Sequence, residues 1–133
     1  ELAADNPRVK IIPPVKSTEV VEAIRRYDMG IFLLPPVNFN YENTLPNKLF
    51  DFIQARLGVA VGPTPEMAEI VRNYGLGIVS EKFTPASVAD QLNKLTRTQI
   101  ETFKRNAMAA AKELNAEANA VKINNLISEV LQP

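Results

Sequence analysis

Short apolar runs alternate along this chain with stretches in which apolar residues recur every three or four positions. The runs predict strands at residues 9–12, 31–34, 59–61 and 78–79. Residues 31–34 are continuously apolar, which is typical of a strand buried on both faces of a parallel sheet. Strands that alternate with helices favour parallel pairing through right-handed crossovers.

Helix starts are marked by small polar residues and by proline. Ser17 or Thr18 is expected to cap a helix that runs to about residue 27, Pro46 to open one that runs to about residue 57, and Thr64 and Thr84 to cap two more. From residue 98 onward the pattern is helical, with an alanine-rich stretch at residues 107–120 and a final apolar helix. We therefore predict a single α/β domain over residues 1–133: a Rossmann-like parallel sheet of about four strands, helices on both faces and a helical C-terminus.

The composition excludes several classes of function. Fifteen basic and fifteen acidic side chains leave no basic stripe for a nucleic-acid backbone. Because the chain has no histidine and no cysteine, it cannot form a Ser-His or Cys-His nucleophile, a disulfide or a cysteine- or histidine-based zinc site. No apolar run approaches the roughly 18 residues that a membrane span needs. The available chemistry is that of carboxylates, lysine, arginine and backbone amides.

A ligand site is expected where the strands end. Ligands of such sheets bind outside the carboxyl ends of the strands, which selects residues 13–16, 35–48 and 62–66. The second segment leads into a helix N-terminus, whose free N–H groups and dipole favour an anion, and Lys48 adds a positive charge. Asp51, one turn further, suits a sugar diol. Each feature also has an ordinary structural explanation: Lys48 as a solvated side chain, and Asp51 as a charge that favours the dipole of its own helix.

One segment carries a family resemblance. Residues 45–61 begin Leu-Pro-Asn-Lys-Leu-Phe-Asp and resemble the Leu-Pro-Asn-Lys-Leu-Phe-Glu segment of group 1 GT-B glycosyltransferases. Residues 65–71, followed by 74–77, are similar to the segment of that family that ends in Gly-x-Gly, and residues 106–117 resemble its C-terminal helix. The resemblance extends over nearly the whole chain.

The resemblance implies a function and a place within a larger enzyme. The family has two Rossmann-like domains, and this chain is similar to most of the second, which binds the nucleotide-diphosphate-sugar donor. The missing first strand–helix–strand of that domain would carry a basic pair for the leaving diphosphate, and the acceptor-binding N-terminal domain is missing too. We therefore expect a glycosyltransferase fragment that is inactive alone, needs no metal or other cofactor, and belongs to polysaccharide biosynthesis. The implied location is cytoplasmic, with peripheral attachment to the inner face of the membrane as an alternative for the intact protein.

The resemblance also implies site residues. Two acidic residues eight positions apart flank the donor loop in the family, and here those positions hold Asn43 and Asp51. Asp51 would hold the ribose hydroxyls, while Asn43 keeps only hydrogen bonding. The expected donor-binding residues are Asn43, Thr44, Leu45, Asn47, Lys48 and Asp51, and the expected neighbours of the base are Pro14, Val15 and Lys16. The catalytic residues are expected outside this chain.

Two other functions remain open. Nucleotide-sugar 2-epimerases share the GT-B architecture, but they usually draw on a catalytic histidine, which this chain lacks. A non-catalytic interaction or regulatory module agrees with the departures at Asn43 and Asp51. Whichever function holds, missing strands would leave an uncovered sheet edge with apolar surface, so we expect a homodimer through that edge.

Overall fold

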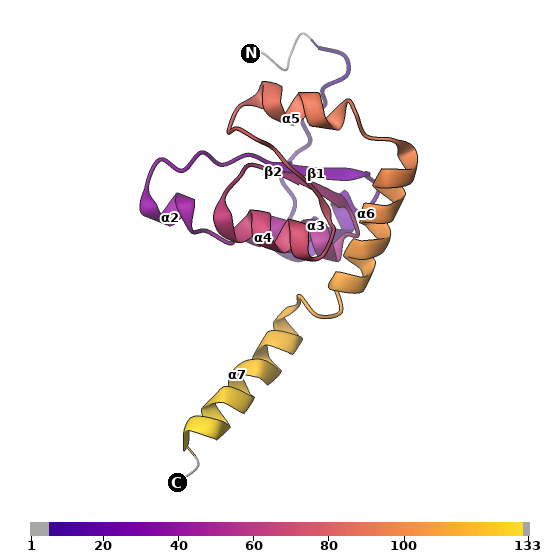
Figure 1. Cartoon of the computed structure of the whole chain (residues 1–133). Helices are drawn as coiled ribbons and strands as arrows, with labels where there is room; N and C mark the ends of the chain where they lie inside the picture. Colours follow the sequence, from indigo (N-terminus) through magenta and orange to yellow (C-terminus); the bar gives the residue numbers. More distant parts are fainter. Residues whose placement is uncertain (1–5, 132–133) are drawn as a thin grey trace.

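A small parallel sheet organises the computed structural model, which describes residues 6–131 (Figure 1). Its three strands are β1 (Met29–Phe32), β2 (Gly58–Val61) and β3 (Gly77–Val79), and they lie in the order β1-β2-β3. Both pairings are parallel, with Gly30 opposite Val59 and Ala60 opposite Ile78. This confirms the predicted α/β class with a parallel sheet.

The helices lie between and after the strands. They are η1 (Ser17–Glu19) and α1 (Val20–Ile24) before β1; α2 (Phe39–Glu42) and α3 (Asn47–Gln54) before β2; α4 (Pro65–Asn73) before β3; and then α5 (Pro85–Leu92), α6 (Arg97–Ala110) and α7 (Ala116–Leu131). Since the strands follow one another in space as in sequence, right-handed crossovers place α3 and α4 on the same face. Figure 1 shows both below the sheet and α5 above it, so helices cover both faces.

The core lies between the sheet and the pair α3 and α4. Val59 and Val61 of β2 point to this face, and every residue of β2 is buried. They pack against Leu49, Ile53, Met67, Val71, Leu76, Ala107 and Ala110. The alternate positions of β2, Gly58 and Ala60, are small, and so is Gly62 directly after it. A Cβ on Gly58 would lie 3.3 Å from Phe103 Cβ, and one on Gly62 would lie 2.6 Å from Phe83 Cδ1.

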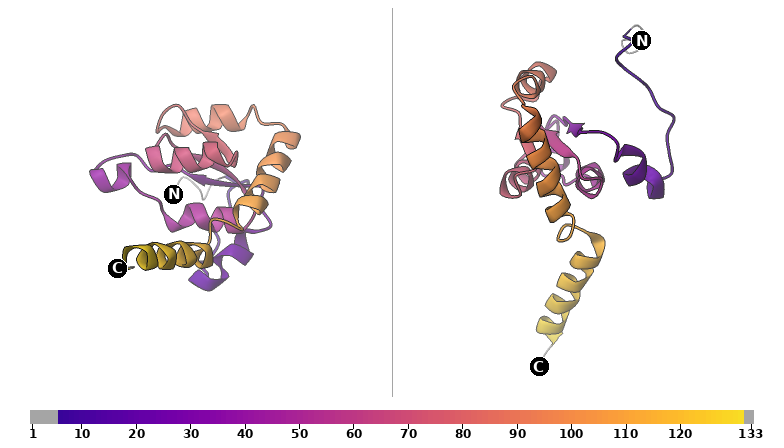
Figure 2. Two further views of the ribbon diagram at one scale, coloured as in Figure 1. Left: turned by 60° about the horizontal axis from the view of Figure 1, so that its bottom comes forward. Right: turned by 90° about the vertical axis from the view of Figure 1, so that its right-hand side faces the viewer.

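The two last helices behave differently. α6 runs beside the sheet and begins with a capping box between Thr96 and Gln99. α7 projects away from the sheet (Figure 2), and none of its described residues is buried. Asn115 separates the two helices: its Nδ2 donates to the carbonyls of Ala111 and Lys112, and its Oδ1 accepts from the N–H of Ala118. Within residues 6–131, neither α7 nor any other helix is long and apolar enough to cross a membrane.

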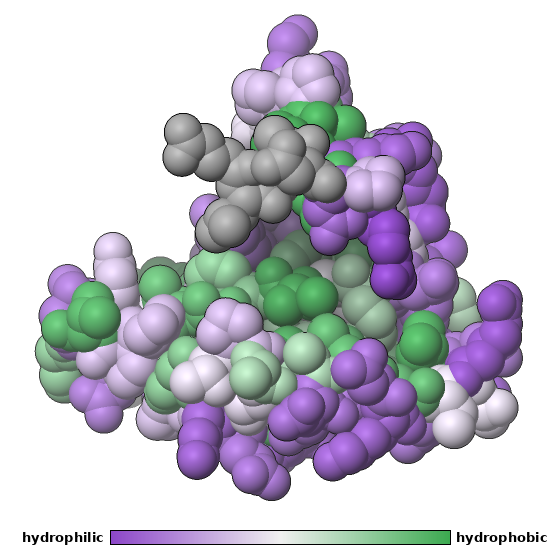
Figure 3. Space-filling view, turned by 90° about the horizontal axis from the view of Figure 1, so that it is seen from above, coloured by the Kyte–Doolittle hydropathy of each residue, from purple (hydrophilic) through white to green (hydrophobic). Residues whose placement is uncertain are grey.

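The first predicted strand is wrong. Residues 9–12 form no strand, and Ile11 and Ile12 are 83% and 56% exposed. An apolar run becomes a strand only when a neighbouring strand accepts and donates its backbone hydrogen bonds, and in the described part of the chain β1 pairs with β2 alone. The sheet therefore has three strands among residues 6–131, not about four. Ile31 of β1 is 52% exposed, and Figure 3 shows apolar side chains at the centre of the face seen from above.

One predicted helix cap is wrong, and a second is right in position but makes no capping hydrogen bond. The N-cap of η1 is Lys16, so Ser17 lies inside the turn, and no side chain caps it. Thr64 is the N-cap of α4, but its hydroxyl caps nothing: Oγ1 is buried without a hydrogen-bond partner. Thr84, by contrast, caps α5 as predicted and accepts from the N–H of Ser87 at 3.3 Å.

The two threonine caps give a matched pair of variants. Thr64→Val replaces an unpartnered buried hydroxyl with a methyl group of the same shape, so we expect it to stabilise the fold by about 1 kcal/mol. Thr84→Val removes a cap that is made, so we expect a loss of about 1 kcal/mol. Urea denaturation of both variants measures whether the free energy of unfolding rises or falls in each. A destabilised Thr64→Val would show that this hydroxyl has a partner in solution.

Candidate functional site

The loop after β1 carries most of the predicted site residues. β1 ends at Phe32, and the chain then passes through α2 before α3 begins at Asn47. Pro46 is the N-cap of α3, and no side chain caps this helix. The N–H of Leu49 donates to the carbonyl of Pro46 at 3.0 Å. The N–H groups of Asn47 and Lys48, which come before it in the first turn, have no carbonyl of the helix to bind and point out of it.

Lys48 brings a positive charge to the carboxyl end of β1. Its Nζ lies 5.5 Å from the centre of the Phe32 ring, a cation–π distance. Lys48 is otherwise exposed. Lys48 and the open first turn of α3 therefore form one electropositive corner at the end of the sheet.

Asp51 and Asn47 line a pocket on a different side of α3. This pocket has a volume of about 470 Å³. One wall is the face of α3 that carries Asn47, Phe50, Asp51 and Gln54, and the other is formed by residues 114–117 and Asn119. The only charged side chains among the described lining residues are Asp51 and Glu117. A pocket with two carboxylates and no cation suits hydroxyl or amine groups and disfavours phosphate.

Gln54 holds the two walls together. Its Nε2 donates to the carbonyl of Ala111 at 3.1 Å and to that of Leu114 at 2.9 Å. These carbonyls follow the last turn of α6, where no amide of the helix remains to bind them. The half-buried Gln54 side chain thus ties the connection between α6 and α7 to α3 and gives the pocket a defined wall.

The other predicted residues lie outside the pocket. Asn43 ends α2, and its Nδ2 donates to the carbonyl of Phe39 at 2.9 Å within that helix. Thr44 is half-buried, and Leu45 is exposed in the connection to α3. The three expected neighbours of the base, Pro14, Val15 and Lys16, are exposed and precede η1. The structure therefore gathers Asn47 and Asp51 in the pocket, with Lys48 beside it on the same helix turn.

Sequence reasoning missed Phe50, Gln54 and the second wall. Gln54 follows Asn47 by seven positions and Asp51 by three, so helical spacing places all three on one face, and that signal was available. No such signal in the sequence marks residues 114–117 and Asn119. They reach α3 only because the chain breaks between α6 and α7, and this tertiary arrangement leaves no local pattern. Among residues 6–131, no three carboxylates gather closely enough to hold a metal ion.

Comparison with known proteins adds no family to this geometry. No family model matches the sequence, and neither a curated protein nor a solved structure matches the chain. A function for this chain is therefore inferred from its own residues and from their arrangement around α3.

Proposed function

We propose that this chain binds a nucleotide-diphosphate-sugar donor and is the donor-binding part of a glycosyltransferase. The observation that carries the proposal is the division of charge along α3: positive groups at its first turn and the carboxylate of Asp51 one turn further. Lys48 and the uncapped first turn favour the diphosphate, and Asp51 lies in a pocket without cations that favours the ribose hydroxyls. Asn47 and Asp51 are one turn apart, about 6 Å along the helix axis.

The mechanism in this proposal is charge stabilisation of a leaving group. In glycosyl transfer the bond between the sugar and the diphosphate breaks, and negative charge develops on the departing diphosphate. Backbone N–H groups at a helix N-terminus and a lysine ammonium stabilise such charge without a metal ion. The acceptor site and the basic pair that the family resemblance implies are outside this chain, so we expect the isolated chain to bind the donor without transferring its sugar. Pro14, Val15 and Lys16 stay a proposal for the base, and the ribose and diphosphate contacts do not depend on them.

A non-catalytic module is the second candidate. Asn43 stands where the family has a carboxylate, and its side chain is engaged with the carbonyl of Phe39 in its own helix. A site without that charge binds a nucleotide sugar more readily than it turns one over. Self-association through the edge of β1 that pairs with no other strand among residues 6–131 is compatible with either candidate, and Ile31 of this strand is half exposed.

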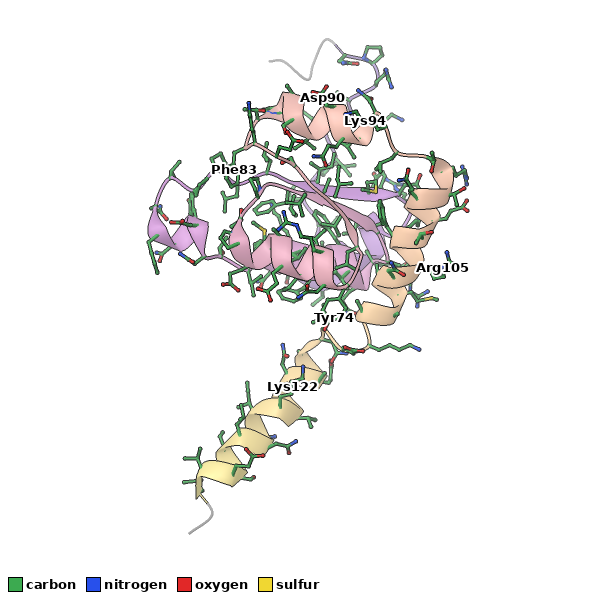
Figure 4. The ribbon with its side chains drawn as sticks, viewed as in Figure 1. Tyr74, Phe83, Asp90, Lys94, Arg105 and Lys122 are labelled. Carbon is green, nitrogen blue, oxygen red and sulfur yellow. The ribbon has the colours of Figure 1, made fainter. Side chains whose placement is uncertain are left out.

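Calorimetric titration of the whole chain with UDP, GDP and UDP-sugars tests the proposal. We expect one nucleotide to bind at low salt, and Asp51→Asn to weaken it about 10- to 100-fold, because a hydrogen bond to a charged group is worth about 1.5–3 kcal/mol. Asp90→Asn is the matched control, since it removes the same charge from α5, on the other side of the sheet (Figure 4), and less than about a threefold change is expected.

Two results would contradict the proposal. If no nucleotide binds to the folded chain, the charge division along α3 has another purpose. If Asp51→Asn binds as tightly as the unmodified chain while Lys48→Met binds more weakly, the nucleotide is held through its phosphates alone and the ribose assignment is wrong.

A further inference from the structure

A second hollow lies beside the C-terminal end of α3 and shares Gln54 with the pocket of Asp51. It has a volume of about 540 Å³, and four cations line it: Arg25, Arg56, Arg105 and Lys112. Arg56 precedes β2 by two residues, so the hollow is at the amino end of that strand. No carboxylate is among its described lining residues, whereas the pocket of Asp51 has two carboxylates and no cation.

This gathering of charge is unusual for the chain as a whole. Acidic and basic side chains are equal in number over the sequence, so four cations around one hollow form a local positive potential. Arg25 is partly compensated, because its Nη1 lies 2.9 Å from Glu22 Oε2. Arg105 Nη2 donates to Thr102 Oγ1 at 3.2 Å, a neutral acceptor. Neither Arg56 nor Lys112 has an ion-pair partner among the described residues.

Helix ends explain part of the cluster. Arg25 is the C-cap of α1, and Arg56 and Lys112 each follow directly after the C-cap of α3 or α6. A cation near a helix C-terminus is favoured by the helix dipole. Arg105 is different, because it lies well inside α6 and reaches the hollow on the same face as Met108 and Lys112. The dipoles therefore account for three of the four cations and leave Arg105 unexplained.

Arg56 supplies an independent observation. It is the one described residue other than glycine with a positive φ, at 63°. Glycine is the usual residue after a helix in this conformation, since a side chain there is strained. An arginine at this position is disfavoured for the backbone, and its side chain lines the hollow. A strained conformation at a residue whose side chain lines a hollow motivates a functional hypothesis for that side chain.

We infer that Arg56, Arg105 and Lys112, with Arg25 at the rim, form a binding site for a phosphate-bearing anion with more than one negative charge. Guanidinium groups match phosphate oxygens in a bidentate geometry. Val21, Met108 and Ala109 also line the hollow, and their apolar side chains suit the carbon atoms next to the phosphate. Such a phosphate belongs either to a soluble phosphorylated molecule or to the headgroup of an anionic lipid. Gln54 lines both hollows, but Lys48 and Asp51 do not line this one, so the variants at those two residues test the two sites separately.

Titration with inorganic pyrophosphate, followed by ¹H–¹⁵N NMR, tests the site. We expect saturable shifts at residue 56 and at residues 105–112, which weaken as salt is added. Arg105→Gln is expected to weaken this binding about tenfold, the loss of one charge-assisted contact. Lys94→Gln is the matched control, because it removes the same charge at a position far from the hollow (Figure 4), and no change is expected.

Arg56→Gly separates binding from structure. If the arginine serves the anion, glycine should weaken pyrophosphate binding about tenfold while the Tm stays equal or rises, because the backbone strain is relieved. If the arginine serves only the dipole of α3, the variant lowers the Tm and binding is unchanged, which overturns the inference. Shifts confined to residues 44–51 that Lys48→Met abolishes would also overturn it, because pyrophosphate would then occupy the donor site alone.

Vesicle flotation identifies the source of the phosphate. Vesicles of phosphatidylcholine with phosphatidic acid, whose phosphomonoester headgroup carries more than one negative charge, are compared with phosphatidylcholine alone. Flotation that needs phosphatidic acid and is lost in Arg105→Gln supports the site with a lipid headgroup as its ligand. Saturable pyrophosphate binding without flotation supports it with a soluble ligand, and the absence of both overturns it.

Discussion

Gly77→Ala is expected to abolish the folded state at 25 °C. Gly77 opens β3 and pairs with Val59 of β2, and a Cβ at this position would overlap the carbonyl oxygen of Val59. The overlapping atoms are backbone atoms of the central strand, so no side chain can turn aside to make room. We expect this overlap to lower the free energy of unfolding by more than about 4 kcal/mol, an exceptional loss for one substitution. A small domain has only about 5–15 kcal/mol of stability in total, so such a loss removes most of it. Circular dichroism melting of the purified variant measures the result.

Gly75→Ala, two residues earlier, is the matched control. Gly75 has a φ of 59°, and a Cβ there would lie 2.9 Å from Nδ2 of Asn106, a side chain that donates to the carbonyl of Gly75 and can shift only by weakening that bond. The expected loss is about 1–2 kcal/mol, which is the cost of the left-handed conformation for a residue with a Cβ. The chain should stay folded with a lower Tm. Equal losses in the two variants would show that the approach of β3 to β2 is looser than the structure has it.

The elements that the sequence predicts well are those whose signal is local. Residues 59–61 are apolar without interruption, and β2 is buried along its whole length. Pro65 and Pro85 each stand at the first position of a helix, where the missing N–H has no consequence. In each case the residue type and its immediate neighbours suffice.

The errors fall where a distant partner decides the outcome. Residues 9–12 have the pattern of a strand, but a strand also needs a neighbour, and the neighbour is not encoded in the run itself. Thr64 has the right type and place for a cap, and the rotamer of its hydroxyl is decided by the packing around it. α2 is only four residues long within a polar loop, so no helical period could show it. Propensity alone does not separate such a turn from a loop.

The candidate site divides in the same way. The position of Lys48 and Asp51 near the start of a helix at the carboxyl end of a strand follows from the sequence order of the elements. The hydrogen bonds of Gln54 to Ala111 and Leu114 join positions 57 and 60 residues apart, so the second wall of the pocket could not be predicted locally. The basic hollow has the same origin: its cations come from α1, from the end of α3 and from α6, and only the folded chain brings them together.

Leu49→Ala is the second substitution with a large expected effect. Leu49 is fully buried between α3 and the sheet, although Asn47 and Lys48 before it are exposed. Removing a buried leucine side chain leaves a cavity and costs about 2–5 kcal/mol. The midpoint of urea denaturation should fall accordingly, with an unchanged slope if unfolding stays two-state. A loss below that range would mean that α3 is not anchored in the core.

Leu45→Ala, four residues earlier, is the matched control for the loss of a buried leucine. Leu45 is 42% exposed, so the same truncation should cost less than about 1 kcal/mol. The two leucines differ in burial and not in type. A much larger loss of unfolding free energy in Leu49→Ala than in Leu45→Ala therefore shows that the core contact of this segment is made by α3 and not by the connection before it. Because Leu49 does not line the pocket, Leu49→Ala should bind nucleotide normally under conditions that keep it folded, whereas Asp51→Asn should be stable and bind weakly. If Leu49→Ala stays folded and still loses nucleotide binding, the binding groups of α3 are held in place by the packing of this helix against the core.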